Sequence, residues 1–433
     1  MQNNRLRRVC LKFLGISKRV FLVVPIFILG LTVNLFAQGE VSLTLPLHFT
    51  AKAIVKNQGR VRHIAVAPNG NLFLKLEKLR EGAGIVMWKD TNHDGVYEDS
   101  LLFGNYIGTG IALQGGYLVA SSNSAIYRYR LNENFEPIQP NSPERIVYGL
   151  LDKGQHASKS ITIDDKGFIY VNIGAPSNIC QVEDRKAGSP GLLPCPILDS
   201  AGGIWRFSAN QLDQTYAQGI RYATGLRNVV GLDWNHEVND LYVTVHGRDM
   251  LYQHFPNLYT AKTGAELPAE TFYRLKQGQD GGWPYVYWDQ FQNKKILSPE
   301  YGGDGNKEGA PQAISPLMAF PGHLAPNALL FYTGKQFPPK YQNGAFIAFH
   351  GSWNRNPEFQ EGFYVVFVPM KNGIPTGDWE IFADGFTGKG KVMSPRDAQH
   401  RPCGLAMTSD GSLLVSDDAK GWVWKISYTE NSK

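Results

Sequence analysis

The chain has 433 residues, with 43 Lys or Arg against 38 Asp or Glu and a formal net charge of +5. Its 23 Phe, 20 Tyr, 46 Gly and 25 Pro favour many short strands joined by tight turns over a helical protein. Six of the basic residues and none of the acids precede Gln38, which leaves 37 basic and 38 acidic residues in the rest of the chain. A net charge of −1 there removes the electrostatic argument for nucleic-acid binding.

The N-terminus predicts a signal peptide over residues 1–37. Basic residues lead into an apolar run, 20–33, and Leu35 and Ala37 stand before the expected cleavage ahead of Gln38. The alternative is an uncleaved anchor, but the run is shorter than the roughly 20 residues that a membrane span needs. The sequence therefore predicts export to the periplasm or the medium, with no membrane span after cleavage.

The segment DTNHDGVYED, which begins at Asp90, is a candidate calcium loop. The first, third, fifth and sixth positions of such a loop would be Asp90, Asn92, Asp94 and Gly95. The twelfth position is Leu101, where a bidentate Glu is expected. A hairpin turn between two strands explains the same residues, and both interpretations stay open.

Cysteine usage agrees with export. Cys180 and Cys195 bracket a Gly- and Pro-rich loop and are predicted to form a disulfide in an oxidising compartment. Cys403 is then left over and is expected to be buried. The chain has no CxxCH segment, which excludes covalently attached c-type haem.

One pattern recurs six times along the chain: an alternating apolar strand, a polar turn, and a second strand that ends in small residues. The copies begin at Ile64, Gly110, Ile161, Gly231, Ala328 and Gly404. Their spacing is typical of four-stranded blades and predicts an all-β, six-bladed β-propeller over residues 38–433. The alternative, a β-sandwich with similar hairpins, is less favoured by so regular a repeat. The long stretch between the fourth and fifth copies predicts loops that cover one mouth of the propeller.

Cationic or titratable side chains stand at or shortly before the first strand of five of these units. They are His63, His156, Arg227, His323 and Arg401. Considered singly, each of these side chains is explained by a hydrogen bond within its own loop. Because they share one position in the repeat, we expect them to converge on one mouth of the central channel.

Two other motifs are set aside. HEVND, at His236, begins like a zinc-protease helix, but the second His is missing and the segment reads as a hairpin turn. No Rossmann or P-loop glycine pattern precedes a helix, which argues against nicotinamide and nucleotide chemistry.

Taken together, several segments resemble the soluble sugar dehydrogenases that use pyrroloquinoline quinone, especially the sorbosone and aldose dehydrogenase-like branch. They are HASKSITID, YATGLRNVVGLDW, LYVTVHGRD, GGWPY, AFIAFHGSWNR and HRPCGLAMTSDGSLLVSDD. They are spread over nearly the whole chain after residue 37. The resemblance implies a quinone that lies across the channel mouth, with its carboxylates paired to basic residues.

The resemblance also implies roles for single residues. Arg227 and Asn228 match the pair that contacts the quinone, and guanidinium groups suit its carboxylates. Arg401 matches the first of two closely spaced Arg residues, and the second falls on Cys403. His156 matches the general base that takes a proton from the sugar, a task suited to neutral imidazole.

A calcium ion against the quinone is implied too. Gly247 and Arg248 match cofactor-binding positions whose carbonyls hold the ion, and Asp249 is the nearest carboxylate. The substrate sugar is expected beside three further side chains, His246, Trp283 and His323.

The prediction is therefore an exported dehydrogenase of aldoses or related, sorbosone-like sugars. It would transfer hydride to pyrroloquinoline quinone and pass electrons to an external quinone or cytochrome. Two alternatives remain: a calcium-dependent hydrolase of the lactonase type, and a non-catalytic propeller that binds glycans or proteins.

Overall fold

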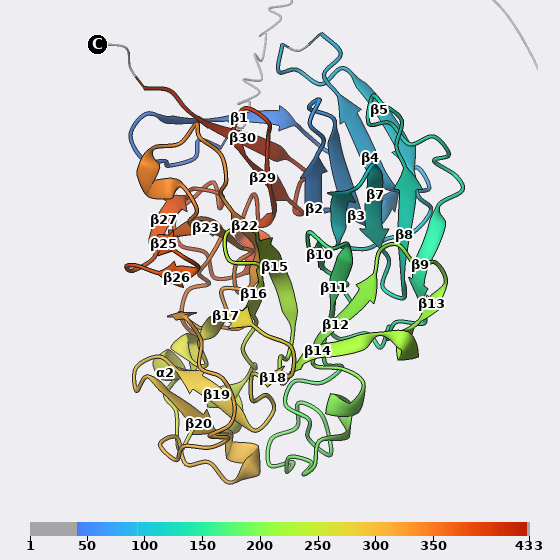
Figure 1. Ribbon diagram of the computed structural model, residues 1–433. Helices are drawn as coiled ribbons and strands as arrows, with labels where there is room; N and C mark the ends of the chain where they lie inside the picture. The colour runs from blue at the N-terminus through green and yellow to red at the C-terminus, as the bar shows by residue number, and fades with distance from the viewer. Residues whose placement is uncertain (1–40, 93, 431–433) are drawn as a thin grey trace, which may run out of the picture. The chain divides into compact units, whose positions relative to one another are not determined.

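The computed structural model describes residues 41–92 and 94–430, and the signal peptide expected over 1–37 lies outside them. Two short helices, α1 (Leu251–His254) and α2 (Ala261–Glu266), and a few turns of 3-10 helix accompany the strands. Six sheets form the blades of a propeller, each with four antiparallel strands, and two of them carry a short fifth strand paired parallel at the edge (Figure 1). The predicted all-β, six-bladed fold is confirmed.

The first three blades follow one another along the chain. Blade 1 contains β2 (Val61–Val66), β3 (Leu72–Arg80), β4 (Ala83–Lys89) and β5 (Asp99–Phe103). Blade 2 contains β6 (Ile111–Gln114), β7 (Tyr117–Ser121), β8 (Ala125–Arg130) and β9 (Glu144–Tyr148), with β13 (Gln214–Thr215) added at its edge. Blade 3 contains β10 (Ile161–Ile163), β11 (Phe168–Ile173), β12 (Gly203–Ser208) and β14 (Ile220–Thr224), with β18 (Gln279–Asp280) at its edge.

The remaining blades complete the ring. Blade 4 contains β15 (Val229–Asn235), β16 (Asp240–Val245), β17 (Glu270–Leu275) and β21 (Met318–Phe320). Blade 5 contains β22 (Pro326–Phe331), β23 (Ala345–Phe349), β24 (Tyr364–Val368) and β27 (Glu380–Ala383). Blade 6 contains β28 (Pro402–Met407), β29 (Leu413–Asp417), β30 (Val423–Tyr428) and β1 (Phe49–Val55).

Each predicted copy of the repeat forms the two inner strands of one blade. The innermost strands β2, β6, β10, β15, β22 and β28 contact one another in this order, and β28 returns to β2. The outermost strand of blade 6 is β1, which pairs antiparallel with β30 from Phe49 opposite Tyr428 to Val55 opposite Val423. One blade is therefore built from both ends of the described chain, and this closes the ring.

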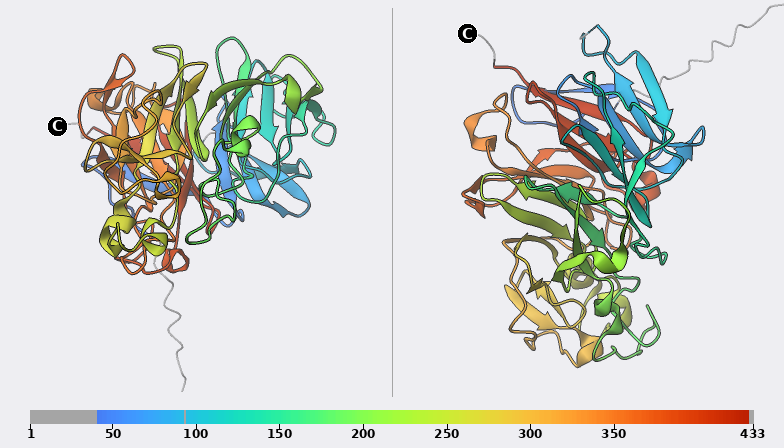
Figure 2. Two further views of the ribbon diagram at one scale, coloured as in Figure 1. Left: turned by 90° about the horizontal axis from the view of Figure 1, so that it is seen from below. Right: turned by 45° about the vertical axis from the view of Figure 1, so that its right-hand side comes forward.

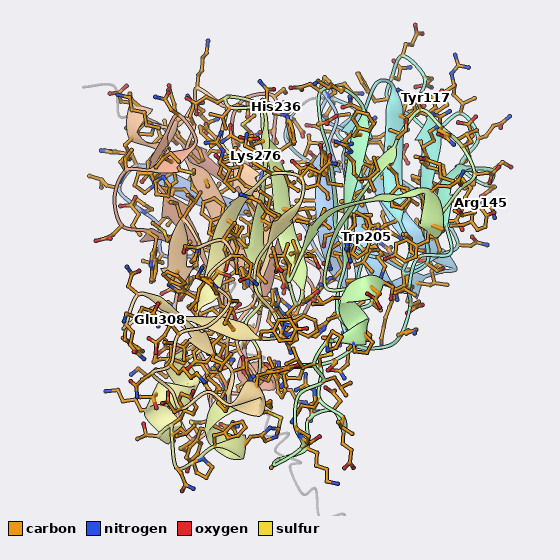
Figure 3. All side chains as sticks on the ribbon, turned by 60° about the horizontal axis from the view of Figure 1, so that its bottom comes forward. Tyr117, Arg145, Trp205, His236, Lys276 and Glu308 are labelled. Atoms are coloured by element: carbon orange, nitrogen blue, oxygen red, sulfur yellow. A yellow bond between two sulfur atoms is a disulfide. The ribbon has the colours of Figure 1, made fainter. Side chains whose placement is uncertain are left out.

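The core lies between the blades, because each sheet buries both of its faces against a neighbour. Six apolar clusters occupy the six interfaces between neighbouring blades. Their strands are accordingly rich in β-branched and aromatic residues along nearly their whole length, as in FIYVNI of β11. The segment HEVND forms the turn between β15 and β16, as expected, and Figure 3 shows His236 there, on the opposite side from Glu308.

Long connections cover one end of the blades. The stretch between β16 and β21 holds both helices and the hairpin of β19 (Val286–Asp289) and β20 (Lys294–Leu297), and the two views of Figure 2 show it beside the loop that follows β11. A smaller hairpin, β25 (Met370–Lys371) and β26 (Ile374–Pro375), extends blade 5. No helix within the described residues is long and apolar enough to cross a membrane.

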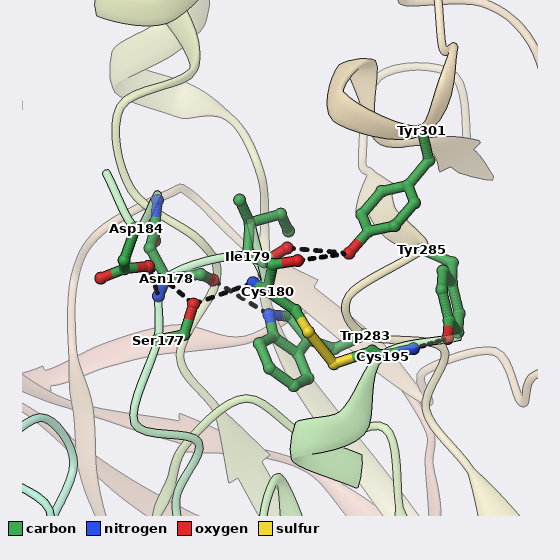
Figure 4. Close-up of a disulfide and its surroundings, with 9 residues drawn as sticks. All are labelled: Ser177, Asn178, Ile179, Cys180, Asp184, Cys195, Trp283, Tyr285 and Tyr301. Atoms are coloured by element: carbon green, nitrogen blue, oxygen red, sulfur yellow. Dashed lines mark hydrogen bonds between the residues drawn. A yellow bond between two sulfur atoms is a disulfide. The ribbon is translucent and has the colours of Figure 1, made fainter. Parts of the chain in front are cut away.

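The predicted disulfide is present in the loop after β11 and joins Cys180 to Cys195 (Figure 4). The Tyr301 hydroxyl donates to the carbonyls of Ile179 and Cys180 at 3.0 and 3.1 Å. The disulfide loop is thereby fixed to the segment that follows β20. Cys403 is free and buried, as expected.

Closure of the ring generates the first prediction. Phe49, 9% exposed, makes edge contacts with the rings of Phe337, Tyr341 and Phe382 at centroid distances of 4.8 to 5.4 Å. Phe49→Ala should lower the free energy of unfolding by about 3 kcal/mol, because it leaves a cavity in the closing blade. Thr50→Ala, at an exposed position of the same strand, is the control and should leave the thermal midpoint unchanged. Equal midpoints for the two variants would show that this strand does not hold the ring closed.

Candidate functional site

A cavity of about 470 Å³ opens at the centre of the ring, and residues from all six blades line it. We call it the mouth cavity. Its ionisable lining side chains are Arg62, Glu77, His156, His246, His350 and Arg401. Of the five residues expected to converge there, His156 and Arg401 line the mouth cavity, whereas His63, Arg227 and His323 do not belong to its lining.

His156 is held in one tautomer. Its Nδ1 lies 2.5 Å from the carbonyl oxygen of Ala175, and because a carbonyl only accepts, Nδ1 carries the hydrogen. The other ring nitrogen, Nε2, is therefore an unprotonated acceptor. Burial, followed by the charge of Arg227, lowers the pKa of His156 to about 3, so the ring is neutral at ordinary pH.

The backbone of residue 174 packs closely against the side chains of His156 and Asn228. His156 itself has φ +55°, and a Cβ on Gly174 would lie 2.5 Å from the Cβ of His156 and 3.0 Å from Oδ1 of Asn228. Only glycine fits at residue 174 without displacing one of these two side chains. The imidazole and the Asn228 amide thus share one wall of the mouth cavity.

Arg227 is 3% exposed and lies behind this wall. Its Nη2 donates to Oδ2 of Asp249 at 2.7 Å and to Oδ1 of Asn178 at 3.0 Å, and its Nη1 donates to the carbonyl of Gly247 at 2.8 Å. Gly225, with φ +67°, begins the turn that directs it there, and a Cβ on Gly225 would collide with Asp280 at 1.9 Å. The guanidinium is therefore paired inside the protein.

Asp249 is the centre of a buried polar network that joins four loops. Besides Arg227, its carboxylate accepts from Arg185 Nη2 at 2.8 Å and from Asn354 Nδ2 at 2.6 Å, and Asn178 donates to its carbonyl oxygen at 3.0 Å. Burial alone would raise the pKa of Asp249, but the positive charge of Arg227 and its neighbours outweighs it and holds that pKa well below the usual range. The carboxylate is ionised and fully occupied.

The three residues expected at a calcium site, Gly247, Arg248 and Asp249, make different contacts within the protein. The Gly247 carbonyl accepts from Arg227, and Arg248 makes a bidentate pair with Glu300 at 2.7 and 2.6 Å inside the protein. The Asp249 carboxylate faces two guanidinium groups, which are unfavourable neighbours for a cation. Main-chain carbonyls are thus the only donors of this set that suit calcium, and the Asp249 carboxylate does not fit.

Asn228 and Arg401 lie at the mouth cavity. Asn228 Oδ1 accepts from Asn172 Nδ2 at 3.2 Å, which leaves its own amide group to donate. Arg401 donates to the carbonyls of His350 and Gly351 at 3.0 and 2.8 Å. Both side chains are therefore oriented by neighbouring loops.

Two of the expected substrate residues, His246 and Trp283, line a smaller cavity of about 50 Å³ together with Arg227, and His323 lies outside it. His246 lines the mouth cavity, and burial lowers its pKa to about 3. Trp283 packs behind the disulfide and donates from Nε1 to the Asn178 carbonyl at 3.0 Å (Figure 4). His323 is buried against α2 and contacts the carbonyls of Gly264 and Leu267 at 2.9 and 3.1 Å. His246 alone of the three is at the mouth.

The candidate calcium loop is an exposed turn before β5. Oxygens of Asp90, Asp94 and Glu98 approach within 4.8 Å of one another, and Asp90 accepts from the backbone of Gly95 at 2.8 Å. Leu101 lies in β5, so the twelfth position supplies no ligand. These contacts are those of a polar hairpin turn.

Sequence reasoning missed Arg62, His350 and Trp353 in the lining of the mouth cavity, and their neighbour Asp418. Arg62 and His350 both contact Asp418, at 2.9 Å from Arg62 Nη1 and 2.7 Å from His350 Nε2. Trp353 stands at the rim with 55% of its surface exposed. A signal was present in the HGSWNR segment and in the second Asp of VSDD, because polar residues cluster directly after an inner strand there.

Comparisons with known proteins agree on one family. A family model described as TrAA12-like matches residues 43–429. The pyrroloquinoline quinone-dependent pyranose dehydrogenase of Coprinopsis cinerea is 24% identical over 353 residues, which are 72% of this chain and 44% of that protein. The chain thus spans less than half the length of that relative. The pyrroloquinoline quinone-dependent sugar dehydrogenase of Hypocrea jecorina is 23% identical over 347 residues, 74% of this chain and 73% of that protein.

Solved structures share the fold. The holo PQQ domain of the Coprinopsis cinerea pyranose dehydrogenase superposes with a TM-score of 0.69 at 20% identity, over 90% of this chain and 98% of that one. A calcium structure of a Trichoderma reesei family AA12 protein gives 0.72 at 17% identity, over 90% and 97%. The apo aldose sugar dehydrogenase of Escherichia coli gives 0.56 at 16% identity, over 88% and 100%.

The network around Asp249 generates a stability prediction. Asp249→Asn keeps the volume but leaves the buried guanidinium of Arg227 without a counter-charge, so the free energy of unfolding should fall by about 3 kcal/mol. Asp213→Asn is the control, because the Asp213–Arg145 pair is largely exposed and should contribute little. Thermal unfolding of the two variants measures the difference, and similar midpoints would contradict a central role for Asp249.

Glu270 generates a pH prediction. Burial raises its pKa from 4.5 to about 8, so between these values the folded protein keeps a proton that the unfolded chain has lost. Stability from this group is therefore present below about pH 4.5 and is lost as the pH rises towards 8, by at most about 1.4 kcal/mol per pH unit. Glu270→Gln should flatten the fall of the thermal midpoint between pH 5 and 8. Glu308→Gln, at an exposed residue, should leave the slope unchanged, and an equal slope in both variants would contradict the assignment.

Proposed function

The chain belongs to the TrAA12-like family, and on this basis we propose that it is a pyrroloquinoline quinone-dependent sugar dehydrogenase that works at the mouth cavity. The observation that carries the proposal is the state of His156. Its Nδ1–H is donated to the Ala175 carbonyl, it is neutral, and it lines the cavity. A neutral imidazole with one free nitrogen can accept the proton of a sugar hydroxyl.

The mouth cavity suits a flat, polyanionic cofactor. Arg62 and Arg401 place two cations on its wall, and Nε of Arg62 is buried without a hydrogen-bond partner among the described residues. Trp353 offers an exposed aromatic face at the rim. Guanidinium groups pair with carboxylates, and an indole stacks on a planar ring, so both features fit pyrroloquinoline quinone.

In the proposed reaction His156 Nε2 accepts the proton of the sugar hydroxyl. The Ala175 carbonyl holds the ring in the required tautomer and stabilises the imidazolium that forms. Pyrroloquinoline quinone, when bound, would supply the two-electron acceptor for the hydride of the sugar. Asn228, fixed by Asn172 beside His156, is positioned to donate to an oxygen at the reacting centre.

Arg227, Gly247 and Arg248 are proposed to act from behind the cavity. Arg227 orients the Gly247 carbonyl and the Asp249 carboxylate. A calcium ion would be held by main-chain carbonyls at Gly247 and Arg248 rather than by Asp249, and Gly247 would be the weaker ligand because its oxygen already accepts from the cationic Arg227. His246 is proposed to contact the sugar. Trp283 and His323 would support the loops around the site, because both are buried away from the cavity.

The proposed substrate is an aldose or related sugar of the sorbosone type, and electrons would pass to an external acceptor. Export is proposed from the N-terminal segment and agrees with the disulfide, which is stable in an oxidising compartment. Sugar specificity would reside in the connections around Trp353 and between β16 and β21, because these surround the end of the blades that holds the site.

Reconstitution tests the proposal. The purified chain is titrated with pyrroloquinoline quinone and calcium, and dye reduction is measured over a panel of aldoses. His156→Gln should lower kcat by at least 100-fold with quinone binding retained, because it removes the base alone. His236→Gln, in an exposed turn outside the mouth, is the matched control and should keep full activity. Arg401→Gln should weaken quinone binding.

Between pH 5 and 8 the rate should show no loss from protonation of His156, because its pKa of about 3 lies below this range. Absence of quinone binding at micromolar concentration would overturn the proposal. Glycan binding without quinone binding would point to a non-catalytic propeller, and turnover of lactones would point to a hydrolase.

A further inference from the structure

A second cluster of side chains lies in the seam between blades 5 and 6, beside the mouth cavity. His350 follows β23, Cys403 lies in β28 and Asp418 follows β29. One ligand atom from each, the imidazole nitrogen, the sulfur and a carboxylate oxygen, lies within 4.8 Å of the other two. The side chains of His350 and Asp418 are 13% and 7% exposed, and Cys403 is fully buried.

The donor set is unusual for a purely structural network. A hydrogen bond of 2.7 Å from His350 Nε2 to Asp418 Oδ1 accounts for two members, but the thiol contributes only a weak contact, 3.7 Å from Asn327 Nδ2. Sulfur, imidazole and carboxylate together are the donors that zinc and similar thiophilic cations prefer. Bond lengths of roughly 2.0 to 2.3 Å bring such donors to a few ångströms from one another, so the side chains need only small shifts.

We propose that His350, Cys403 and Asp418 form a binding site for a thiophilic divalent cation of the zinc class. The ion takes the Cys403 sulfur as thiolate, and the thiol proton is released to solvent. On binding, the imidazole gives up its Nε2–H hydrogen bond to Asp418, takes the other neutral tautomer with its hydrogen on Nδ1, and binds the ion through Nε2. Asp418 supplies Oδ1, while its Oδ2 keeps the contact with Arg62 at 2.9 Å.

The charges of the neighbouring side chains permit a divalent cation at this site but lower its affinity. The ion, the thiolate, the Asp418 and Glu77 carboxylates and the guanidinium groups of Arg62 and Arg401 leave a net charge of one positive unit, so the two guanidinium groups weaken binding without preventing it. The ligands come from two neighbouring blades, and an ion held by both stabilises their seam because it binds the folded chain only. His350 also lines the mouth cavity, but none of the three ligands is the proposed base, and binding of the ion can be measured without quinone.

Cobalt(II) tests the site, because a thiolate bound to cobalt gives a near-ultraviolet charge-transfer band. The full chain is titrated with Co²⁺ without quinone and without reductant, so that Cys180 and Cys195 stay paired. The expected result is one equivalent of bound cobalt with this band, displacement of the band by Zn²⁺, and a higher thermal midpoint with Zn²⁺ present.

Variants assign the ligands. Cys403→Ser should abolish the band, because it removes the free thiol of the described residues. His350→Gln should weaken cobalt binding at least tenfold, and Asp94→Asn should leave the band unchanged. Absence of the band in the unmodified chain, or a band that persists in Cys403→Ser, overturns the proposal. Because no quinone is present, failure here is distinct from failure of the dehydrogenase activity.

Discussion

The buried carboxylate of Asp249 is the interaction on which the arrangement of the mouth depends. It binds the guanidinium groups of Arg185 and Arg227 and the amide of Asn354, which come from the loops after β11, before β15 and after β23. These loops contain at most isolated β-bridges, such as Gln181 with Gly191 and Gln360 with Val392, and no strand of a blade. Breaking a buried pair leaves an uncompensated charge, so this carboxylate stabilises the observed arrangement of the loops.

The network reaches the proposed base through its neighbours. Arg185 also donates from Nε to Oε1 of Gln155 at 3.1 Å, and Gln155 directly precedes His156. On the other side, Asn354 follows Trp353 at the rim. The base and the aromatic rim are thus fixed to the same carboxylate from opposite sides, although neither touches it. Arg227 also lowers the pKa of His156, so the residue that holds the loops together helps to keep the base neutral.

The fold could be predicted from the sequence because every blade of a propeller repeats the same strand–turn–strand pattern. Each inner hairpin carries its own alternation and turn, and six copies in phase leave little freedom for another architecture. The site could be predicted only in part. His156 and Arg401 lie on the connections that enter the mouth, as their place in the repeat indicated. Arg227 shares that place, yet its side chain turns inward, because Asp249 and Asn178 offer a buried partner that no local pattern encodes.

Position 403 shows why a residue-by-residue comparison with a family is insufficient. The resemblance expects an arginine at this position, where this chain has Cys403. In the structure Arg62 from blade 1 lies beside Cys403, and its guanidinium pairs with Asp418. A cation from another blade thus occupies the wall on which Arg401 and His350 also lie. In a closed ring the inner strands of neighbouring blades approach one another, so a charge that one blade lacks can be supplied by the next. Cys403 is then free to contribute sulfur to the seam, where an arginine side chain would have filled the space.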